Sequence, residues 1–237
     1  MSDKCWAVIP ARGGSTGVKG KNIKILGNKP LIAHTINTLK KSNIFEKIIV
    51  TSDCENILSI SEKFGAQVHL RLDPEESNNI VMPDIPVLSF LETVPKDELP
   101  KFCIMAQCTA PFVSTKSYCD ALKVLRLHPT STAFAAHRAH FFLWNKKDES
   151  NQDSDWLPIN HPFNERLGRQ FSKTEQVHET GAFYTFPTKE FMTARHRFFS
   201  KAYPVMISGN EIIDINTEND WVFAEFLIEK MRNGYEN

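Results

Sequence analysis

A short apolar run that leads directly into a glycine-rich basic loop constrains this chain more than any other feature. Residues 5–9 (CWAVI) are apolar without alternation, which is typical of a strand covered on both faces, and Pro10 ends the ladder of such a strand. Residues 11–22 then contain four glycines and three cations. Glycines let backbone amides turn inward around an anion, and cations supply the opposite charge. The pattern predicts a polyphosphate-binding loop at the carboxyl end of a buried strand.

This loop matches neither of the two standard phosphate-binding fingerprints. The spacing G-x-x-x-x-G-K-[ST] fails because Asn22 follows Lys21, and G-x-G-x-x-G is absent. A P-loop ATPase and a Rossmann dehydrogenase are therefore disfavoured. The alternative is a solvated loop that is merely flexible, and the position directly after a buried strand argues against it.

The composition limits the kinds of protein that this chain can be. Its 237 residues suffice for one α/β domain with a modest insertion, and its 28 basic and 28 acidic residues give no net attraction to nucleic acid or an anionic membrane. The five cysteines lack a C-x-x-C pair, which favours reduced thiols in an intracellular protein. No signal peptide or membrane span is recognisable. We expect a cytoplasmic protein of a prokaryotic-type cell, although a nuclear protein of a eukaryote would look similar.

Apolar runs alternate with helical periodicity through the first half of the chain, which is typical of repeated βα units on a parallel sheet. Thr217, with Asp220 three residues later, approximates a capping box at the start of the last helix. The expected fold is α/β, with a doubly wound, mostly parallel sheet of Rossmann-like type. We expect strands at 5–9, 47–51, 66–70, 101–106, 132–136, 181–186 and 202–207, and helices at 30–41, 55–64, 84–94, 115–127 and 217–231.

Residues 138–179 interrupt this pattern, because aromatic and charged residues mix there without a period. A loop of this length inside a compact domain is usually functional or covers a partner. We interpret it as a dimerisation arm inserted into a single domain that spans residues 1–237, since its large apolar residues would otherwise be exposed. His137 and His140 could suggest a metal pair, but side chains three apart on a strand point to opposite faces, so a structural role is favoured.

Several stretches of the chain resemble one family in the same order. Residues 9–23 (IPARGGSTGVKGKNI) are similar to the opening signature of the acylneuraminate cytidylyltransferases, the CMP-sialic acid synthetases, except that Thr16 replaces the usual lysine. Further similar stretches lie at 27–36, 49–53, 106–111, 179–184 and 213–221. The resemblance implies a sheet of nucleotidyltransferase type. It also implies transfer of CMP from CTP to the anomeric hydroxyl of a nonulosonic acid, a nine-carbon 2-keto sugar acid, with release of pyrophosphate.

The resemblance also implies which residues form the site. Catalytic roles would fall to Arg12, Lys21 and Asp214, and Mg²⁺ would be held by Asp214 and Asn216, the latter standing where the family has a second aspartate. The nucleotide would be bound by Ala11, Arg12, Gly13, Gly14, Ser15, Thr16, Lys21, Asn22 and Arg71. The sugar acid would be bound by Gln107, Arg169, Gln170, Tyr184, Phe198 and Phe199, the two phenylalanines coming from the partner subunit in family dimers. Core or dimer packing is the alternative for Phe198 and Phe199.

Two departures from the family pattern leave other functions open. Thr16 lacks the charge of a lysine, and an amide at Asn216 can bind Mg²⁺ only as a neutral ligand. The alternatives are a nucleotidyltransferase for another acid sugar, such as a Kdo-like acid, or for another base, and a homologue that binds nucleotide or sugar with weakened catalysis. The expected partners are CTP, a small acid sugar and a second copy of the chain, without nucleic acid or membrane. The product would supply a surface carbohydrate such as lipopolysaccharide or capsule.

Overall fold

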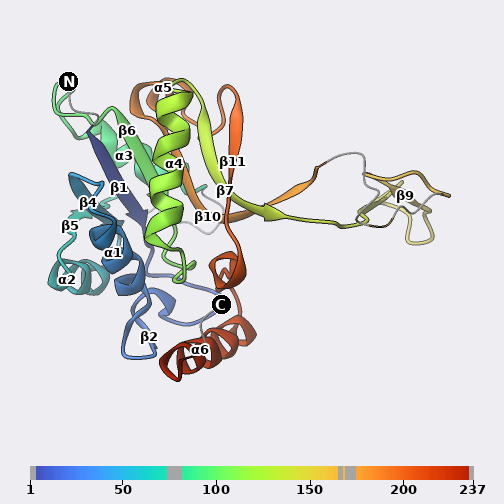
Figure 1. The fold of residues 1–237 in the computed structure, drawn as a ribbon, viewed down its shortest axis with the longest axis horizontal. Coiled ribbons are helices and arrows are strands. Elements are labelled where there is room, and N and C mark those ends of the chain that lie inside the picture. The colour runs from blue at the N-terminus through green and yellow to red at the C-terminus, as the bar shows by residue number, and fades with distance from the viewer. Residues whose placement is uncertain (1–3, 74–81, 165–167, 169–174, 235–237) are drawn as a thin grey trace. The chain divides into compact units, whose positions relative to one another are not determined.

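The computed structural model describes residues 4–73, 82–164, 168 and 175–234. The chain divides into two compact units, Met1–His137 together with Glu179–Asn237, and Arg138–His178. Figure 1 shows the sheet and its helices in the first unit. None of the helices in the described ranges is both long and apolar enough to cross a membrane.

The first unit is built on a seven-stranded sheet in the order β11-β7-β10-β6-β1-β4-β5. Strand β1 pairs in parallel with β4 and β6, β4 with β5, and β11 with β7, whereas β10 is antiparallel to β6. The predicted mostly parallel sheet is therefore confirmed. The strands are β1 (Cys5–Pro10), β4 (Lys47–Ser52), β5 (Gln67–Leu70), β6 (Phe102–Ala106), β7 (Thr132–Arg138), β10 (Val177–Pro187) and β11 (Ala202–Met206).

Helices cover both faces of this sheet, so the doubly wound arrangement is also confirmed. Ala7 and Ile9 of β1 pack in one apolar cluster with residues of three helices, α1 (Leu31–Ser42), α2 (Glu55–Lys63) and α4 (Thr115–Leu127). Trp6 and Val8 pack in a second cluster with α3 (Asp84–Glu92) and α5 (Thr188–Ala194). Alternate side chains of β1 thus enter different cores, which explains its unbroken apolar sequence.

A third apolar cluster joins the loop after β1 to the last helix, α6 (Glu218–Arg232). Val18 and Leu26 pack there with Ile215 and Trp221. Thr217 caps α6, and its reciprocal contacts with Asp220 form the predicted capping box. Three short elements lie before α1, namely η1 (Lys21–Ile23), β2 (Ile25–Leu26) and β3 (Lys29–Pro30), and η4 (Gly209–Ile212) precedes α6.

Every predicted strand and helix is present, with ends that differ by one or two residues in most cases. Strand β10 is longer than predicted, because it begins at Val177 rather than Gly181. Helix α5 and the four short elements were not predicted. All five cysteines are free thiols, as expected.

The second unit, Arg138–His178, contains a two-stranded antiparallel ribbon of β8 (Trp144–Lys146) and β9 (Trp156–Pro158). The His161 ring packs edge-on against Phe142 and Trp144, with centroids 4.9 and 5.0 Å apart. Several large apolar side chains remain exposed within the single chain. They are Phe141, Leu143, Trp144, Trp156, Leu157, Ile159 and Phe163.

Candidate active site

A cavity of about 540 Å³ opens at the edge of the sheet where β1 and β6 end. Strand β1 lies between β4 and β6, so the chain winds outward in both directions from this point, as at the ligand-binding crevice of open α/β sheets. Because β10 is antiparallel to β6, Gly181 and Tyr184 lie on either side of Phe183, which pairs with the last residue of β6, and so reach the same edge. The segment before α6 completes the wall.

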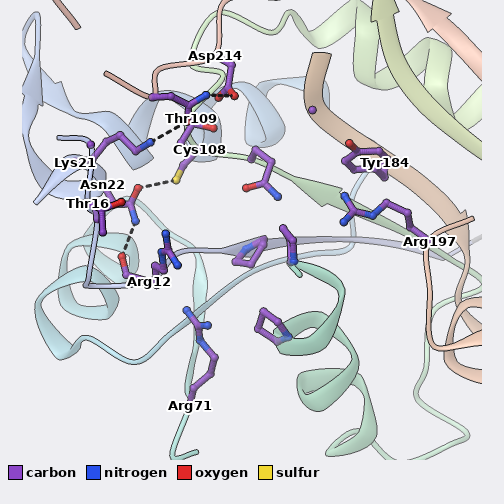
Figure 2. A pocket seen from close by; sticks show the side chains of 18 residues that line it. Arg12, Thr16, Lys21, Asn22, Arg71, Cys108, Thr109, Tyr184, Arg197 and Asp214 are labelled. Carbon is purple, nitrogen blue, oxygen red and sulfur yellow. Dashed lines mark hydrogen bonds between the residues drawn. The ribbon is translucent and has the colours of Figure 1, made fainter. Parts of the chain in front are cut away.

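Ten of the predicted site residues line this cavity, although they come from distant parts of the sequence. The loop after β1 contributes Arg12, Ser15, Thr16, Lys21 and Asn22. Arg71, Gln107, Tyr184, Asp214 and Asn216 come from elsewhere in the chain. The predicted phosphate loop and the predicted metal and sugar positions therefore meet in one place (Figure 2).

The other predicted residues do not form the cavity wall in the single chain. Ala11 is buried, and Ala11, Gly13 and Gly14 are not among the lining residues. The Phe198 ring packs edge-on against Tyr184 and Phe134, and Phe199 packs against the same core. Their contribution to a partner's site remains a prediction. Arg169 and Gln170 lie outside the described residues.

Side-chain hydrogen bonds of Asn22 fix the backbone of the predicted phosphate loop. The Asn22 amide donates from Nδ2 to the carbonyl oxygen of Arg12 at 2.9 Å, and its Oδ1 accepts from the Cys108 thiol at 3.1 Å. Burial raises the pKa of Cys108 to about 12, so the side chain remains a protonated donor. Asn22 therefore ties the two ends of the loop together and joins them to the loop after β6.

Asp53, at the end of β4, connects the loop to Arg71. Its Oδ1 accepts a hydrogen bond from the backbone N–H of Gly13 at 2.8 Å and lies 3.8 Å from Nη2 of Arg71. The Arg71 side chain is almost fully buried, and Nη2 also donates to the Thr51 carbonyl at 3.4 Å. The guanidinium is thus held in a fixed orientation at the cavity wall.

Lys21 and the segment before α6 form a connected polar group (Figure 2). The Lys21 ammonium donates to the Ile215 carbonyl at 2.6 Å and to Oδ1 of Asn216 at 3.4 Å. The amide nitrogen of Asn216 donates to Oδ2 of Asp214 at 2.7 Å. Burial, partly opposed by Cys108 and Asp214, lowers the pKa of Lys21. The amide of Asn216 therefore bridges a cation and a carboxylate, which an aspartate at this position could not do.

The loop and this segment are in close contact at Gly17. A β-carbon at Gly17 would lie 1.9 Å from the backbone oxygen of Asn216, so only glycine fits. The N–H of Ile215 donates to the Thr109 carbonyl at 2.8 Å, which fixes the segment from the other side. Lys21 and Asp214 are therefore positioned by backbone packing as well as by their own hydrogen bonds.

Asp214 is suited to bind a hard divalent cation such as Mg²⁺. Its Oδ1 is buried and has no hydrogen-bond partner among the described residues, whereas Oδ2 accepts from Asn216. A carboxylate oxygen in this state gains most from a cation ligand. In the described part of the chain, no three or more histidine, cysteine or acidic side chains are grouped so that they could hold a metal ion. A metal at Asp214 would therefore depend on ligands supplied by a bound substrate or water.

Arg197 was missed in the sequence, although it lines the cavity beside Tyr184. Its guanidinium forms an ion pair with the fully buried Asp84, with 2.7 Å between Nη2 and Oδ2. The two residues are 113 positions apart, and neither belongs to a recognisable motif. No local sequence pattern could have revealed the pair.

Comparison with known proteins agrees with the sequence resemblance. A model of the cytidylyltransferase family matches residues 6–151. N-acylneuraminate cytidylyltransferase A of Danio rerio is 31% identical over 97% of this chain, which spans 51% of that protein. CMP-N,N'-diacetyllegionaminic acid synthase of Legionella pneumophila is 28% identical over 94% of this chain and 95% of its own length. Pseudaminic acid cytidylyltransferase of Campylobacter jejuni is 27% identical over 96% of each.

Two solved structures share the fold at low sequence identity. A CMP:2-keto-3-deoxy-manno-octonic acid synthetase complexed with CTP has a TM-score of 0.72 at 16% identity, covering 96% of this chain and 99% of that chain. A 4-diphosphocytidyl-2C-methyl-D-erythritol synthase from Anaerococcus prevotii has a TM-score of 0.65 at 14% identity, covering 95% and 98%. They confirm the predicted nucleotidyltransferase-type sheet. Because the family model covers more than half of the chain, the protein belongs to the cytidylyltransferase family of nucleotidyltransferases.

Proposed function

We propose that this protein transfers CMP from CTP to the anomeric hydroxyl of a nonulosonic acid and releases pyrophosphate. The observation that carries the proposal is the meeting of the loop cations Arg12 and Lys21 with the Asp214 carboxylate in one cavity. Cations beside a carboxylate with an unpartnered oxygen suit a triphosphate and its metal. The names of the Danio, Legionella and Campylobacter relatives support a nonulosonic acid as the acceptor.

The residues of the cavity suggest how the transfer proceeds. The anomeric hydroxyl oxygen of the acid attacks the α-phosphorus of CTP. The bond between this phosphorus and the oxygen that bridges the α- and β-phosphates breaks, and pyrophosphate leaves. The hydroxyl proton is released to water. Lys21, held by Ile215 and Asn216, would stabilise charge on the triphosphate, and Arg12 would add a second, bidentate donor. Mg²⁺ at Asp214 would supply further charge neutralisation when bound. Such a reaction needs mainly positioning and charge stabilisation from the protein.

The sugar acid, which accepts the CMP group, would bind in the part of the cavity opposite Lys21. Gln107 follows β6, and its backbone N–H donates to the Ala182 carbonyl at 2.9 Å, which holds it beside β10. Its side-chain amide can donate to and accept from sugar hydroxyls. Tyr184 and Arg197 also line the cavity, on the side opposite Lys21, Thr16 and Asn22 (Figure 2). This division leaves one side of the cavity for the nucleotide and the other for the sugar acid.

We further propose that the protein acts as a homodimer formed through the second unit. Its exposed aromatic and aliphatic side chains would be shielded from water by another copy. Phe198 and Phe199 pack against the core of the single chain but are only partly buried, so their exposed parts would contribute to the partner's site.

The decisive experiment is a pyrophosphate-release assay with CTP, Mg²⁺ and a panel of acids. The panel contains N-acetylneuraminic, legionaminic, pseudaminic and Kdo acids, each also tested with the other three nucleoside triphosphates. Release with CTP and at least one nine-carbon acid is expected. Release only with Kdo would favour the eight-carbon alternative. CTP binding without release for any acid would mean that the protein binds nucleotide without turnover.

A further inference from the structure

Arg197 lies in the loop between α5 and β11, and both its backbone and its side chain make hydrogen bonds or ion pairs. Besides the ion pair with Asp84, its backbone N–H donates to Oδ1 of the same carboxylate at 2.8 Å. Its backbone carbonyl accepts a hydrogen bond from the Thr132 hydroxyl. The guanidinium carbon lies 4.4 Å from the centroid of the Tyr184 ring. Backbone and side chain are therefore both held in place before a ligand binds.

The buried partner changes what this arginine can recognise. Asp84 is completely buried and Arg197 is only 13% exposed at its side chain, so the two charges balance each other away from water. An arginine whose charge is already balanced offers little additional attraction to an anion. It still carries five N–H donors in a rigid plane, and a hydrogen bond from a charged donor to a neutral oxygen is strong. The pair is thus suited to an uncharged oxygen acceptor.

Arg71 also lines the cavity and differs from Arg197 in the burial of its acidic neighbour. Arg71 lies 3.8 Å from Asp53, which is 30% exposed, whereas the carboxylate that contacts Arg197 is fully buried. Figure 2 places Tyr184 and Arg197 on the opposite side of the cavity from Lys21, Thr16 and Asn22. A ligand whose phosphates lie at Lys21 would therefore present a different group to Arg197.

We propose that Arg197 is a specificity-determining residue that binds an uncharged oxygen acceptor of the sugar acid, either a hydroxyl or an amide carbonyl. Asp84 is its positioning residue, and Tyr184 supports the plane of the guanidinium. The inference rests on the proposed function, because it assigns Arg197 to the acceptor side of that reaction. It adds a determinant of substrate choice that lies outside the motifs shared with the family.

The test compares steady-state kinetics of the wild type with two variants. Arg197→Lys keeps the charge next to Asp84 but loses the planar donor arrangement. The double variant Arg197→Met with Asp84→Asn removes both charges, so no buried carboxylate is left unpaired. It allows the KM for the acid to be measured even if the single variant does not fold. In both, the KM for the acid should rise about 10-fold, the effect of one lost charged hydrogen bond, while the KM for CTP stays within about twofold.

Arg195→Lys is the matched control, because Arg195 lies two residues away in the same loop and pairs with the exposed Glu92 at 2.5 Å. This variant should keep both KM values. Using N-acetylneuraminic acid and its analogue with a hydroxyl in place of the acetamido group identifies the acceptor. If the KM of the variants rises more for the acetylated acid than for the analogue, Arg197 binds the amide carbonyl. Equal rises in KM indicate that it binds a hydroxyl.

Two results would overturn the assignment. If the Arg197 variants turn over with an unchanged KM for the acid, or if only the KM for CTP rises, Arg197 does not bind the acceptor. Absence of turnover by the wild type with every acid would instead reject the proposed function, and this inference with it.

Discussion

Lys21 is held in place by the protein itself, through the Ile215 carbonyl and the amide oxygen of Asn216. We expect Lys21→Ala to lower turnover at saturating CTP by roughly 100-fold or more, because the variant loses a fixed charge that stabilises the transition state. The matched control is Lys19→Ala, since Lys19 is exposed in the same loop and does not line the cavity. Near-normal turnover by the Lys21 variant would show that its charge is not used.

Asn216 tests the metal proposal. In Asn216→Asp the donor to Asp214 is lost, and two carboxylates face each other at the distance that the amide now bridges. A cation relieves that repulsion, so the Mg²⁺ concentration for half-maximal rate should fall. A magnesium titration of initial rates measures this, with the shift of thermal unfolding by Mg²⁺ as a readout independent of activity. If both quantities match the wild type, the metal does not bind at Asp214.

Sequence reasoning found the residues of the loop because they are contiguous, and it found Asp214 because the segment resembles a family motif. It did not find the bridging role of the Asn216 amide, which depends on a lysine 195 positions earlier in the chain. The Asp84–Arg197 pair was missed for the same reason. Contacts between residues far apart in the chain depend on the order of the strands in the sheet. They therefore cannot be predicted from the periodicity of a local stretch of sequence.

At the scale of elements, the loop after β1 and the segment before α6 act as one structure because they meet at Gly17. In Gly17→Ala, the new methyl group would displace the backbone of Asn216, with a cost of about 1–3 kcal/mol in folding free energy. We expect weaker CTP binding by calorimetry and lower turnover, because Lys21 and Asp214 would no longer be aligned. This prediction fails if CTP affinity is unchanged.

Gly14→Ala is the control for that experiment. A β-carbon there would have no heavy atom within 4 Å, and its backbone is not left-handed. Gly14→Ala makes the same glycine-to-alanine replacement as Gly17→Ala, with the same effect on the entropy of the unfolded chain, but without the clash with the backbone of Asn216. Its free energy of unfolding should not fall below that of the wild type, so a loss of stability confined to Gly17→Ala would be due to the contact with Asn216.

The helices and strands of the first unit could be predicted because each long element carries its own pattern. Strand β1 is apolar throughout since both of its faces are buried, and α6 begins at a recognisable capping box. Helix α5 has only seven residues, which is slightly less than two turns, and η1 and η4 are shorter still. So few residues show no helical periodicity in the sequence. Elements of this length are specified by tertiary contacts such as the stacking of Phe186 on Phe191.

At the scale of the whole molecule, the sequence predicted the parallel sheet but not that β10 runs against β6. The antiparallel direction matters for the site, because it brings Gly181 and Tyr184 to the edge where β6 ends. Strand direction follows from the path of the connection, and here residues 138–178 lie between β7 and most of β10. Their irregular composition gave no indication of the direction in which the predicted strand at 181–186 would run.

The same residues carry the last prediction, that the protein is a homodimer formed through Arg138–His178. Trp156 and Phe163 are 57% and 64% exposed in the single chain, and burying the rest of such a ring contributes at most about 3 kcal/mol. Light scattering at micromolar concentration should therefore give twice the chain mass of 27.0 kDa. The variant Trp156→Ser with Phe163→Ser should shift the mass toward the monomer, whereas Leu127→Ser, an exposed apolar residue of α4, should not. A wild-type monomer would refute the dimer, and a dimer unaffected by the double change would place its interface on the first unit.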